Sequence, residues 1–171
     1  MMHYELKRGT LSELPQVYKI IDDRIHWMDA VGIRQWNVTD YWECYPKSYY
    51  EKAVHDGTLY VLKNPDDDQV VSVAVLYEQD ARWAKQQGPA AYYVHHLATR
   101  IGEKGAGVEM VRQCENLAAK NQKQYLRLDC AIDNPKINAY YDRLHYDYAG
   151  TCVDGKYAGN LRQKRVGRSV F

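Results

Sequence analysis

A glycine-rich turn that leads into a helical pattern most limits how this chain can fold. The stretch "RIGEKGAGVEMV", residues 100–111, places Gly102, Gly105 and Gly107 within six residues. Apolar residues then recur at helical spacing as far as residue 118. Such a turn directs unpaired backbone N–H groups and the positive end of the helix dipole toward one point, which predicts an anion-binding loop. The glycine spacing fits neither a P-loop nor the dinucleotide fingerprint.

Length and charge narrow the class of protein. With 171 residues the chain can bury a full core, and we expect a single domain over residues 1–171. The formal net charge of +1 argues against a general nucleic-acid binder and against a membrane-surface protein. No apolar run has the length of a signal peptide or a membrane span, so we expect a cytoplasmic protein without nucleic-acid or membrane partners.

The cysteines and tyrosines give two further expectations. The four cysteines, Cys44, Cys114, Cys130 and Cys152, lie far apart with no C-x-x-C pair, so neither a metal site nor a disulfide framework is indicated. We expect all four to be small buried hydrophobic residues. The chain has 16 tyrosines and one phenylalanine, and buried phenols need hydrogen-bond partners. Some of these tyrosines should therefore line a wet cleft.

Hydrophobic periodicity predicts the first half of the fold. A short strand before Gly9 is followed by a long helix that begins near Leu11 and ends at Gly32. Pro46 can open a second helix that stops at Gly57. Two β-branched runs joined by "NPDDD" predict a hairpin, and residues 91–100 predict another strand.

The second half continues the alternation of strands and helices. Residues 124–131 alternate as a strand does, and Asn134 and Pro135 are typical of a helix start. The tail predicts two strands around the turn at Asp154 and Gly155. The order β-α-α-β-β-β-α-β-α-β-β predicts an α/β (α+β) fold, with one mixed, mostly antiparallel twisted sheet of about seven strands and helices on both faces.

Two segments of this chain resemble the GNAT superfamily of N-acetyltransferases. "LAT" at residues 97–99 and "GEKGAG" at residues 102–107 match the family's strand end and its Gln/Arg-x-x-Gly-x-Gly/Ala loop, although Gly102 replaces the usual Gln or Arg. "NPKINAYYDRLHY" is similar to the family's Asn-x-x-Ala-x-x-x-Tyr-x-x-x-Gly-Phe segment, with Asn134 and Tyr141 at its Asn and Tyr. The "GIRQW" and "RLDC" segments also resemble one bacterial branch of the superfamily.

The resemblance implies acetyl-CoA as co-substrate, with its pyrophosphate on the backbone N–H groups of residues 104–108. Arg100 or Lys104 could supply the charge missing at Gly102. The pantetheine arm would pair with the main chain of residues 97–99. The residues expected to bind acetyl-CoA are Leu97, Ala98, Thr99, Lys104, Gly105, Ala106, Gly107, Val108, Asn134 and Tyr141.

The resemblance also implies direct attack of an amine on the thioester. A backbone N–H near Leu97 would stabilise the oxyanion, and Tyr141 would protonate the departing thiolate. The residues alone leave Tyr141 or Tyr140 as an ordinary core aromatic. A general base is expected, with Asp129 or His96 as candidates, each acting directly or through water.

Each candidate base also has an ordinary structural interpretation. Asp129 could instead form an ion pair with Arg127 or another cation. His95 and His96 should project to opposite faces of a strand, which excludes a metal pair, and one of them should be buried and merely hydrogen-bonded.

Two further segments carry weaker signals. The basic tail with Arg162, Lys164, Arg165 and Arg168 predicts a solvated edge strand, with a dimer contact or a negatively charged partner as the alternatives. An aromatic block could wall a pocket for a small amine, although at least half of its members should simply pack the helix against the sheet. The block consists of Trp27, Gln35, Trp36, Tyr41 and Trp42.

These patterns together predict an acetyl-CoA-dependent N-acetyltransferase that acts on a primary amine of a small molecule through a ternary complex. Acetylation of a peptide or protein N-terminus is the alternative reaction. A non-catalytic, CoA-binding regulatory module is the alternative class, since Gly102 departs from the family pattern. A nucleic-acid binder with stacked tyrosines is disfavoured by the charge. We expect a monomer or a homodimer.

Overall fold

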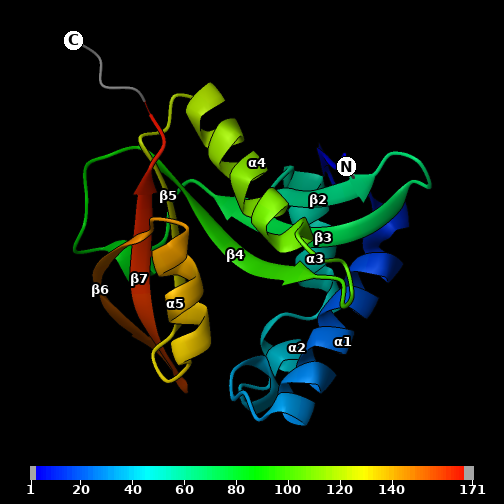
Figure 1. Cartoon of the computed structure of the whole chain (residues 1–171), viewed down its shortest axis with the longest axis horizontal. Coiled ribbons are helices and arrows are strands. Elements are labelled where there is room, and N and C mark those ends of the chain that lie inside the picture. The colour runs from blue at the N-terminus through cyan, green and yellow to red at the C-terminus, as the bar shows by residue number, and fades with distance from the viewer. Residues whose placement is uncertain (1–2, 168–171) are drawn as a thin grey trace. The chain divides into compact units, whose positions relative to one another are not determined.

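The computed structural model describes residues 3–167 and contains a seven-stranded sheet in the order β1-β2-β3-β4-β5-β7-β6 (Figure 1). The β4–β5 pair is parallel, while the pairs β1–β2, β2–β3, β5–β7 and β6–β7 are antiparallel. The predicted mixed, mostly antiparallel sheet is therefore confirmed. The strands are β1 (Glu5–Arg8), β2 (Leu59–Asn64), β3 (Gln69–Tyr77), β4 (Ala91–Thr99), β5 (Tyr125–Ala131), β6 (Asp147–Asp154) and β7 (Tyr157–Arg165).

The helices follow the predicted order with one addition. A short helix, α2, occupies the segment that the sequence left irregular, and single 3-10 turns occur at Leu11–Glu13, Trp36–Val38 and Ala81–Trp83. Within residues 3–167, no helix has both the length and the apolar character needed to cross a membrane. The helices are α1 (Leu14–Val31), α2 (Tyr41–Cys44), α3 (Lys47–Asp56), α4 (Ala106–Lys120) and α5 (Pro135–Arg143).

The chain groups into two compact units, and the boundary runs through β4 and α4. The first unit comprises residues 1–76 and 95–113, and the second comprises residues 77–94 and 114–171. That residues 1–171 form one domain stays a prediction.

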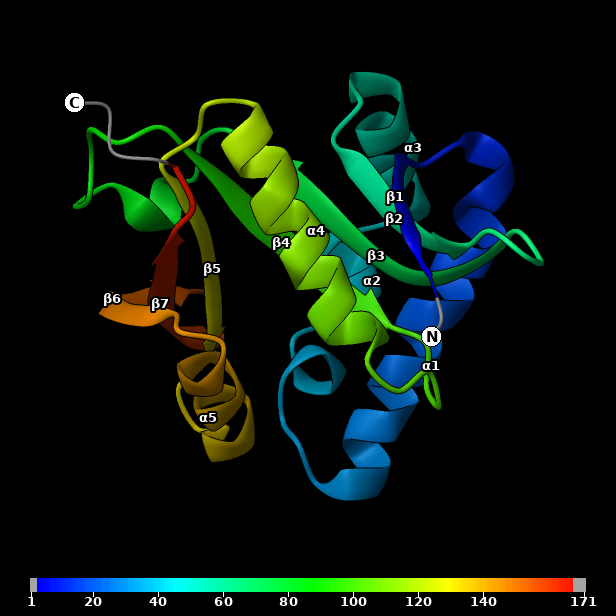
Figure 2. The same cartoon turned by 45° about the horizontal axis from the view of Figure 1, so that its top comes forward.

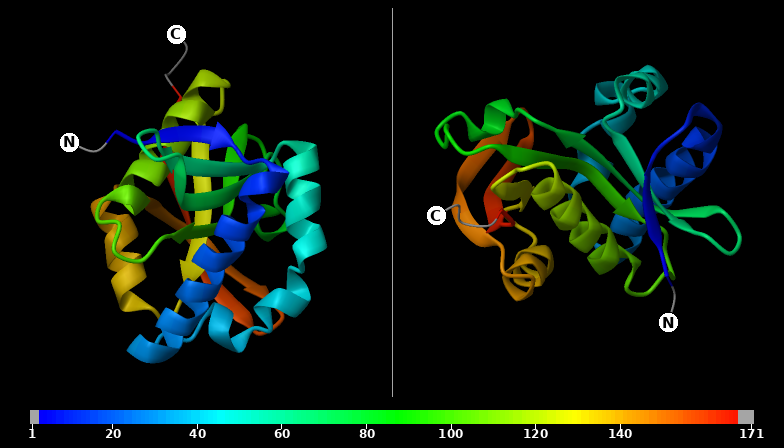
Figure 3. Two further views of the ribbon diagram at one scale, coloured as in Figure 1. Left: turned by 90° about the vertical axis from the view of Figure 1, so that its right-hand side faces the viewer. Right: turned by 90° about the horizontal axis from the view of Figure 1, so that it is seen from above.

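The first unit contains the β2–β3 hairpin together with α1 and α3 (Figures 2 and 3). Both helices end where the sequence predicts, because Gly32 and Gly57 adopt left-handed C-cap conformations with φ of 75° and 73°. Helix α1 buries Val17 and Ile21 completely. Its Gln16 also accepts a hydrogen bond from the Val70 amide of β3 at 3.0 Å, which ties the helix to the hairpin.

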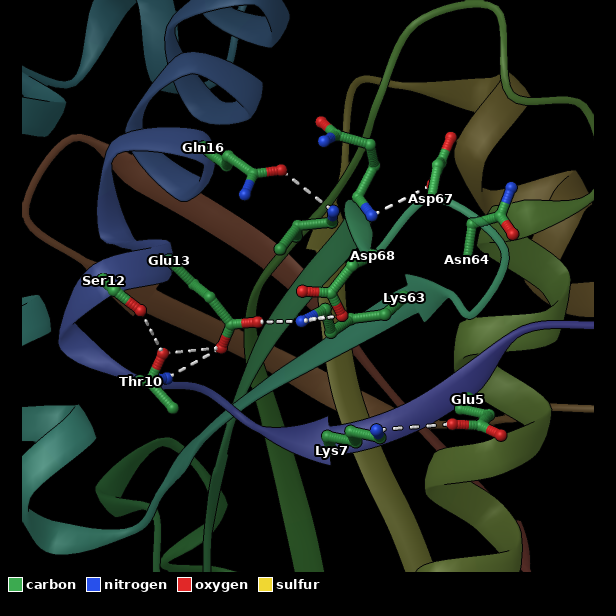
Figure 4. Close-up of polar contacts among 12 residues, drawn as sticks. Glu5, Lys7, Thr10, Ser12, Glu13, Gln16, Lys63, Asn64, Asp67 and Asp68 are labelled. Carbon is green, nitrogen blue, oxygen red and sulfur yellow. Dashed lines mark hydrogen bonds and ion pairs between the residues drawn. The ribbon is translucent and has the colours of Figure 1, made fainter.

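A buried carboxylate anchors the start of α1 to the hairpin (Figure 4). Glu13 accepts hydrogen bonds from the backbone and side chain of Thr10, and it forms a 2.7 Å ion pair with Lys63 of β2. Lys63 also pairs with Asp68 in the hairpin turn at 2.7 Å. Burial by itself raises the pKa of Glu13, but the hydrogen bonds from Lys63 and Thr10 outweigh it and hold that pKa below its ordinary value.

We expect Glu13→Gln to lower the free energy of unfolding by about 1–3 kcal/mol at pH 7. Because the folded-state pKa is lowered, the contribution of the carboxylate is complete above its ordinary pKa of 4.5 and is lost as pH falls through the folded value. Urea denaturation at several pH values measures this. Glu5→Gln is the control, because Glu5 pairs with Lys7 at the exposed surface at 3.4 Å. The prediction would be contradicted if both variants lost the same free energy of unfolding. It would also be contradicted if the difference between Glu13→Gln and the wild type persisted at acidic pH.

In the second unit, β5 pairs with β4 on one side and β7 on the other, and α5 packs against β5 (Figure 1). Helix α5 starts as predicted, since the Asn134 side chain caps the Ile137 amide at 3.2 Å and Pro135 follows. A core cluster of this unit contains Trp83, Ala91, Tyr93, Cys152 and Leu161.

The basic tail departs from its prediction. Strand β7 lies between β5 and β6, and Arg162 is 6% exposed, so the expectation of a solvated edge strand is wrong. The guanidinium is accommodated because four of its hydrogen bonds go to residues 138–146. Arg168 lies outside the described residues.

The cysteines follow their prediction with one exception. Cys114, Cys130 and Cys152 are buried free thiols, whereas Cys44 at the end of α2 is exposed. The expectation of four buried cysteines is therefore wrong for Cys44, because the short helix α2 turns that side chain to solvent. Burial raises the pKa of Cys114 to about 12, so this thiol stays protonated and unreactive near neutral pH.

Candidate functional site

The predicted anion-binding loop has the backbone geometry that its glycines allow. Gly102 and Gly105 have φ of 89° and 81°, a conformation that other residues rarely adopt, and no atom lies within 4 Å of the place where a Cβ would stand on either. Helix α4 begins at Ala106 immediately after the loop. The left-handed backbone explains why glycine stands at position 102 in place of a long polar side chain.

The first turn of α4 offers unpaired donors. Among residues 3–167, the amides of Gly105, Gly107 and Val108 have no hydrogen-bond acceptor. The amides of Lys104 and Ala106 donate to the carbonyls of Gly102 and Glu103 at 3.2 and 3.3 Å. The prediction that every amide from Lys104 to Val108 is available is therefore wrong at those two positions, where the loop closes its own turn.

Side chains and backbone hold the N-terminal part of this loop. The Arg100 amide donates to the Val71 carbonyl of β3 at 2.8 Å. The Glu103 carboxylate accepts a hydrogen bond from the Tyr4 hydroxyl at 3.0 Å and lies 3.8 Å from Arg100. Arg100, one of the two cations predicted to replace the charge missing at Gly102, therefore faces a carboxylate of the loop itself.

The end of β4 is anchored through its carbonyls. The Ser72 hydroxyl donates to the Ala98 carbonyl at 2.9 Å, and Arg24 Nε of α1 donates to the Thr99 carbonyl at 2.7 Å. A carbonyl oxygen has two lone pairs, so each of these groups can accept one more hydrogen bond. The strand that was predicted to face the pantetheine arm is thus fixed in place by its neighbours.

A left-handed residue interrupts β4 directly before Leu97. His96 has φ of 55°, although it lies in the middle of a strand. A non-glycine residue in this region costs on the order of 1–3 kcal/mol, and such residues gather at functional sites. The rings of His95 and His96 lie 6.0 Å apart, closer than opposite strand faces would place them. The prediction that they project to opposite faces is wrong because this backbone conformation breaks the alternation.

His96 is buried within a group of phenols, which we call the His96 cluster: His96, Tyr41, Tyr45, Tyr49 and Tyr50. The Tyr41 hydroxyl lies 2.7 Å from His96 Nδ1, and the Tyr49 hydroxyl lies 3.0 Å from Nε2. Tyr41 in turn shares a short hydrogen bond with the Tyr50 hydroxyl. Both imidazole nitrogens therefore contact hydroxyl groups that can either donate or accept a proton.

The surroundings of this cluster keep the Tyr41 phenol neutral. Burial and the neighbouring Tyr50 raise the pKa of Tyr41 well above its ordinary value. The Tyr45 ring packs edge-on against His96, with centroids 4.3 Å apart. The prediction that one of the two histidines is buried and hydrogen-bonded is confirmed for His96.

The predicted aromatic block divides into two groups. Trp36 lies 4.8 Å from the Tyr41 ring and Trp42 lies 5.5 Å from it, so both adjoin the His96 cluster. Trp27 instead packs against the Arg24 guanidinium, and the backbone N–H of Gln35 donates to the side-chain oxygen of Asn37. Only part of the block therefore lies beside the buried histidine.

In the second unit, Tyr141 on α5 is a buried phenol. Its side chain is 6% exposed, and it packs edge-on against Tyr140 and Tyr146 at 5.1 and 5.6 Å. Within residues 3–167 its hydroxyl has no hydrogen-bond partner. Burial raises the pKa of Tyr141 above the ordinary value of 10.0, so the phenol stays protonated across the physiological range.

Asp129 occupies a polar network on β5. Arg82 Nη1 donates to both carboxylate oxygens at 3.3 Å, and the Tyr157 hydroxyl donates to Oδ1 at 2.6 Å. The ion-pair interpretation is thus confirmed, with Arg82 as the cation. Arg127 instead donates to Tyr93, Gln163 and a backbone carbonyl.

Several residues of the His96 cluster and of the surroundings of α5 were not predicted from the sequence. Tyr45 and Tyr49 follow Tyr41 at intervals of four, a helical spacing that could have indicated a shared face. Pro46 interrupts that pattern, which hid the relation. Asn138, which accepts hydrogen bonds from Cys130, Asn160 and Arg162, carries no signal in a single sequence.

The sequence matches the model of the acetyltransferase (GNAT) family over residues 21–146, which is most of its length. The chain belongs to the GNAT family of acetyltransferases. The loop of residues 102–107 and the segment that starts at Asn134 both lie within this match, so the resemblance that they suggested is confirmed.

A curated relative with an N-acetyltransferase name agrees with this assignment. The chain is 24% identical over 110 residues to an uncharacterized N-acetyltransferase, YesJ, of Bacillus subtilis (strain 168), and the match spans 60% of each chain. The matched part is thus less than two thirds of that curated relative.

Solved GNAT structures share the fold. A GNAT acetyltransferase from Listeria monocytogenes aligns with a TM-score of 0.77 at 17% identity, over 96% of this chain and 95% of that one. PaiA N-acetyltransferase from Thermoplasma acidophilum, solved in complex with coenzyme A, aligns with a TM-score of 0.73 at 15% identity, over 96% and 99%. At these identities the likeness concerns the fold.

Proposed function

We propose that this GNAT protein transfers the acetyl group of acetyl-CoA to a primary amine of a small molecule, by direct attack within a ternary complex. The observation that carries the proposal is Tyr141, a buried phenol that stays protonated and has no partner among the described residues. Such a group is suited to protonate a departing thiolate.

The glycine loop supports acetyl-CoA as the donor. The free amides of Gly105, Gly107 and Val108 lie at the start of a 15-residue helix, where the helix dipole favours a phosphate. These three amides suit the pyrophosphate of CoA. Asn134 is assigned to the acetyl-CoA site through the family motif alone, and its side chain also caps α5.

In the proposed reaction the amine nitrogen attacks the thioester carbonyl carbon, and the carbonyl oxygen gains a negative charge. The Leu97 amide, next to the left-handed His96, is proposed to donate to this oxyanion. The C–S bond then breaks and the sulfur takes the phenolic proton of Tyr141. The ammonium proton leaves to a base, and this base restores the proton of Tyr141 through solvent after release of CoA.

His96 is the proposed base. Each of its nitrogens adjoins a hydroxyl, so a proton can reach the imidazole directly or through Tyr49. Asp129 remains the second candidate, although Arg82 and Tyr157 already donate to its oxygens. The uncharged aromatic rings of the His96 cluster, Trp36 and Trp42 suit a small amine.

The proposal is tested by binding and by turnover. Acetyl-CoA at one hundred times its dissociation constant should stabilise the protein by about 2.7 kcal/mol in thermal unfolding. A panel of small amines and N-terminal peptides, assayed for release of free thiol, should then give turnover with small amines. Turnover with peptides alone would favour N-terminal acetylation, and binding without turnover would favour a regulatory module. In the same assay His96→Gln should lose turnover and Asp129→Asn should retain it.

A further inference from the structure

Arg162 contacts the helix that carries Tyr141 at several points. Its Nε and Nη2 donate to Asn138 Oδ1 at 3.3 and 3.2 Å, and its Nη1 donates to Asp142 Oδ1 at 2.6 Å. Nη1 also donates to the backbone carbonyl of Tyr146, which lies two residues beyond the C-cap of α5, Leu144. One guanidinium therefore spans two successive turns of α5 and the segment that follows.

The residues that Arg162 contacts lie on both sides of Tyr141 in the sequence. Asn138 and Asp142 are four residues apart and share one face of α5, and Tyr141 lies between them. The Tyr146 ring packs against Tyr141, and the Tyr146 amide donates to the Tyr141 carbonyl at 2.9 Å. A shift of Arg162 would thus move the residues on both sides of the phenol.

Asn138 links the same helix to two strands. Its Nδ2 donates to the carbonyls of Ala131 and Asn134, both at 2.9 Å, and its Oδ1 also accepts from Asn160 of β7 at 2.9 Å. Because Arg162 supplies two more donors to this oxygen, it holds the amide in one orientation. The rotation of α5 about its axis is thereby fixed against β5 and β7.

The orientation of the Tyr141 hydroxyl depends on this placement. No hydrogen bond within residues 3–167 orients the hydroxyl, so ring packing and the position of α5 determine where it points. We propose that Arg162 is a positioning residue for Tyr141: its guanidinium clamps α5 to β7 and so aims the phenol at the reacting sulfur. This inference rests on the proposed function and assigns a role to a buried arginine that the reaction does not otherwise use.

A double-mutant cycle tests the proposal. Arg162→Gln should lower kcat by about ten- to a hundredfold, because misplacement of a reacting group by about 1 Å has effects of this size. The KM for acetyl-CoA should stay within about twofold. In a Tyr141→Phe background Arg162→Gln should cause no further loss of kcat, since the group that it positions is gone. Independent, additive losses would overturn the proposal.

Two further variants keep the test informative if Arg162→Gln fails to fold. Asp142→Asn weakens one arm of the clamp at a side chain that is 65% exposed, and it should give a smaller loss of kcat that also vanishes in the Tyr141→Phe background. Arg127→Gln is the matched control, because Arg127 is as buried but, among residues 3–167, its hydrogen bonds go to Tyr93, Gln163 and the Gln86 carbonyl and none goes to α5. It should lower Tm without lowering kcat.

The outcomes separate this inference from the proposed function. Absence of turnover in the wild-type protein overturns both. Turnover that falls equally in Arg162→Gln and Arg127→Gln, in proportion to lost stability, overturns the positioning role and leaves the proposed function standing. Partial recovery of kcat in Arg162→Lys, which keeps the charge but lacks the planar fork that bridges Asp142 and Asn138, would support the clamp.

Discussion

Tyr141→Phe should lower kcat by about 10²–10³-fold, the range expected when a general acid is removed. The ring remains, so its packing against Tyr140 and Tyr146 is kept and the fold should survive. The Kd for acetyl-CoA should change by less than about twofold, because the phenolic proton acts only as the thiolate departs. Thiol-release kinetics and thermal shift measure the two quantities.

Tyr140→Phe is the matched control for this experiment. Tyr140 precedes Tyr141 on the same helix and has a raised pKa that also arises mainly from burial. Loss of the Tyr140 hydroxyl should leave kcat nearly unchanged. Equal rates for the wild type and Tyr141→Phe, or equal losses in both variants, would show that the phenol of Tyr141 is not the acid.

Gly105→Val should weaken the binding of acetyl-CoA by about five- to thirtyfold, since a left-handed backbone costs an L-residue roughly 1–2 kcal/mol. No atom lies within 4 Å of the site of the added Cβ, so the effect comes from the φ of 81° and not from a clash. Relaxation of this residue would turn its amide, and those of Gly107 and Val108, away from their common target. Isothermal titration calorimetry measures the affinity.

Gly32→Val provides the control for Gly105→Val. Gly32 has a φ of 75° and equally open surroundings, but it ends α1 and offers no donor to the loop. Both variants should lose comparable stability, and only Gly105→Val should lose affinity for acetyl-CoA. Unchanged affinity in Gly105→Val would remove the proposed role of the loop amides.

The sequence predicted most of the fold because its elements end at residues with a local physical reason. Gly32 and Gly57 terminate helices through left-handed caps, and Asn134 starts one through its own side chain. Such signals need only the neighbouring residues. The burial of Arg162 depends on strand order and on partners about 20 residues away in the chain, so no local pattern could reveal it.

The candidate site was predictable to the same extent. The glycine loop and Tyr141 lie in motifs that a single sequence displays, whereas the His96 cluster assembles residues from α2, α3 and β4. Tyr49 and His96 are 47 residues apart, and their contact depends on the left-handed turn of the strand. A departure from regular strand geometry is the kind of feature that alternation rules cannot anticipate.

That left-handed conformation also places His96 at a position where selection for stability and selection for chemistry act in opposite directions. Glycine would relieve the backbone strain there, and asparagine would tolerate it, but neither carries an imidazole between two phenols. A library screened only for thermal stability should therefore drift away from histidine at this position. A library screened for acetyl transfer should restore it and accept the lower melting temperature.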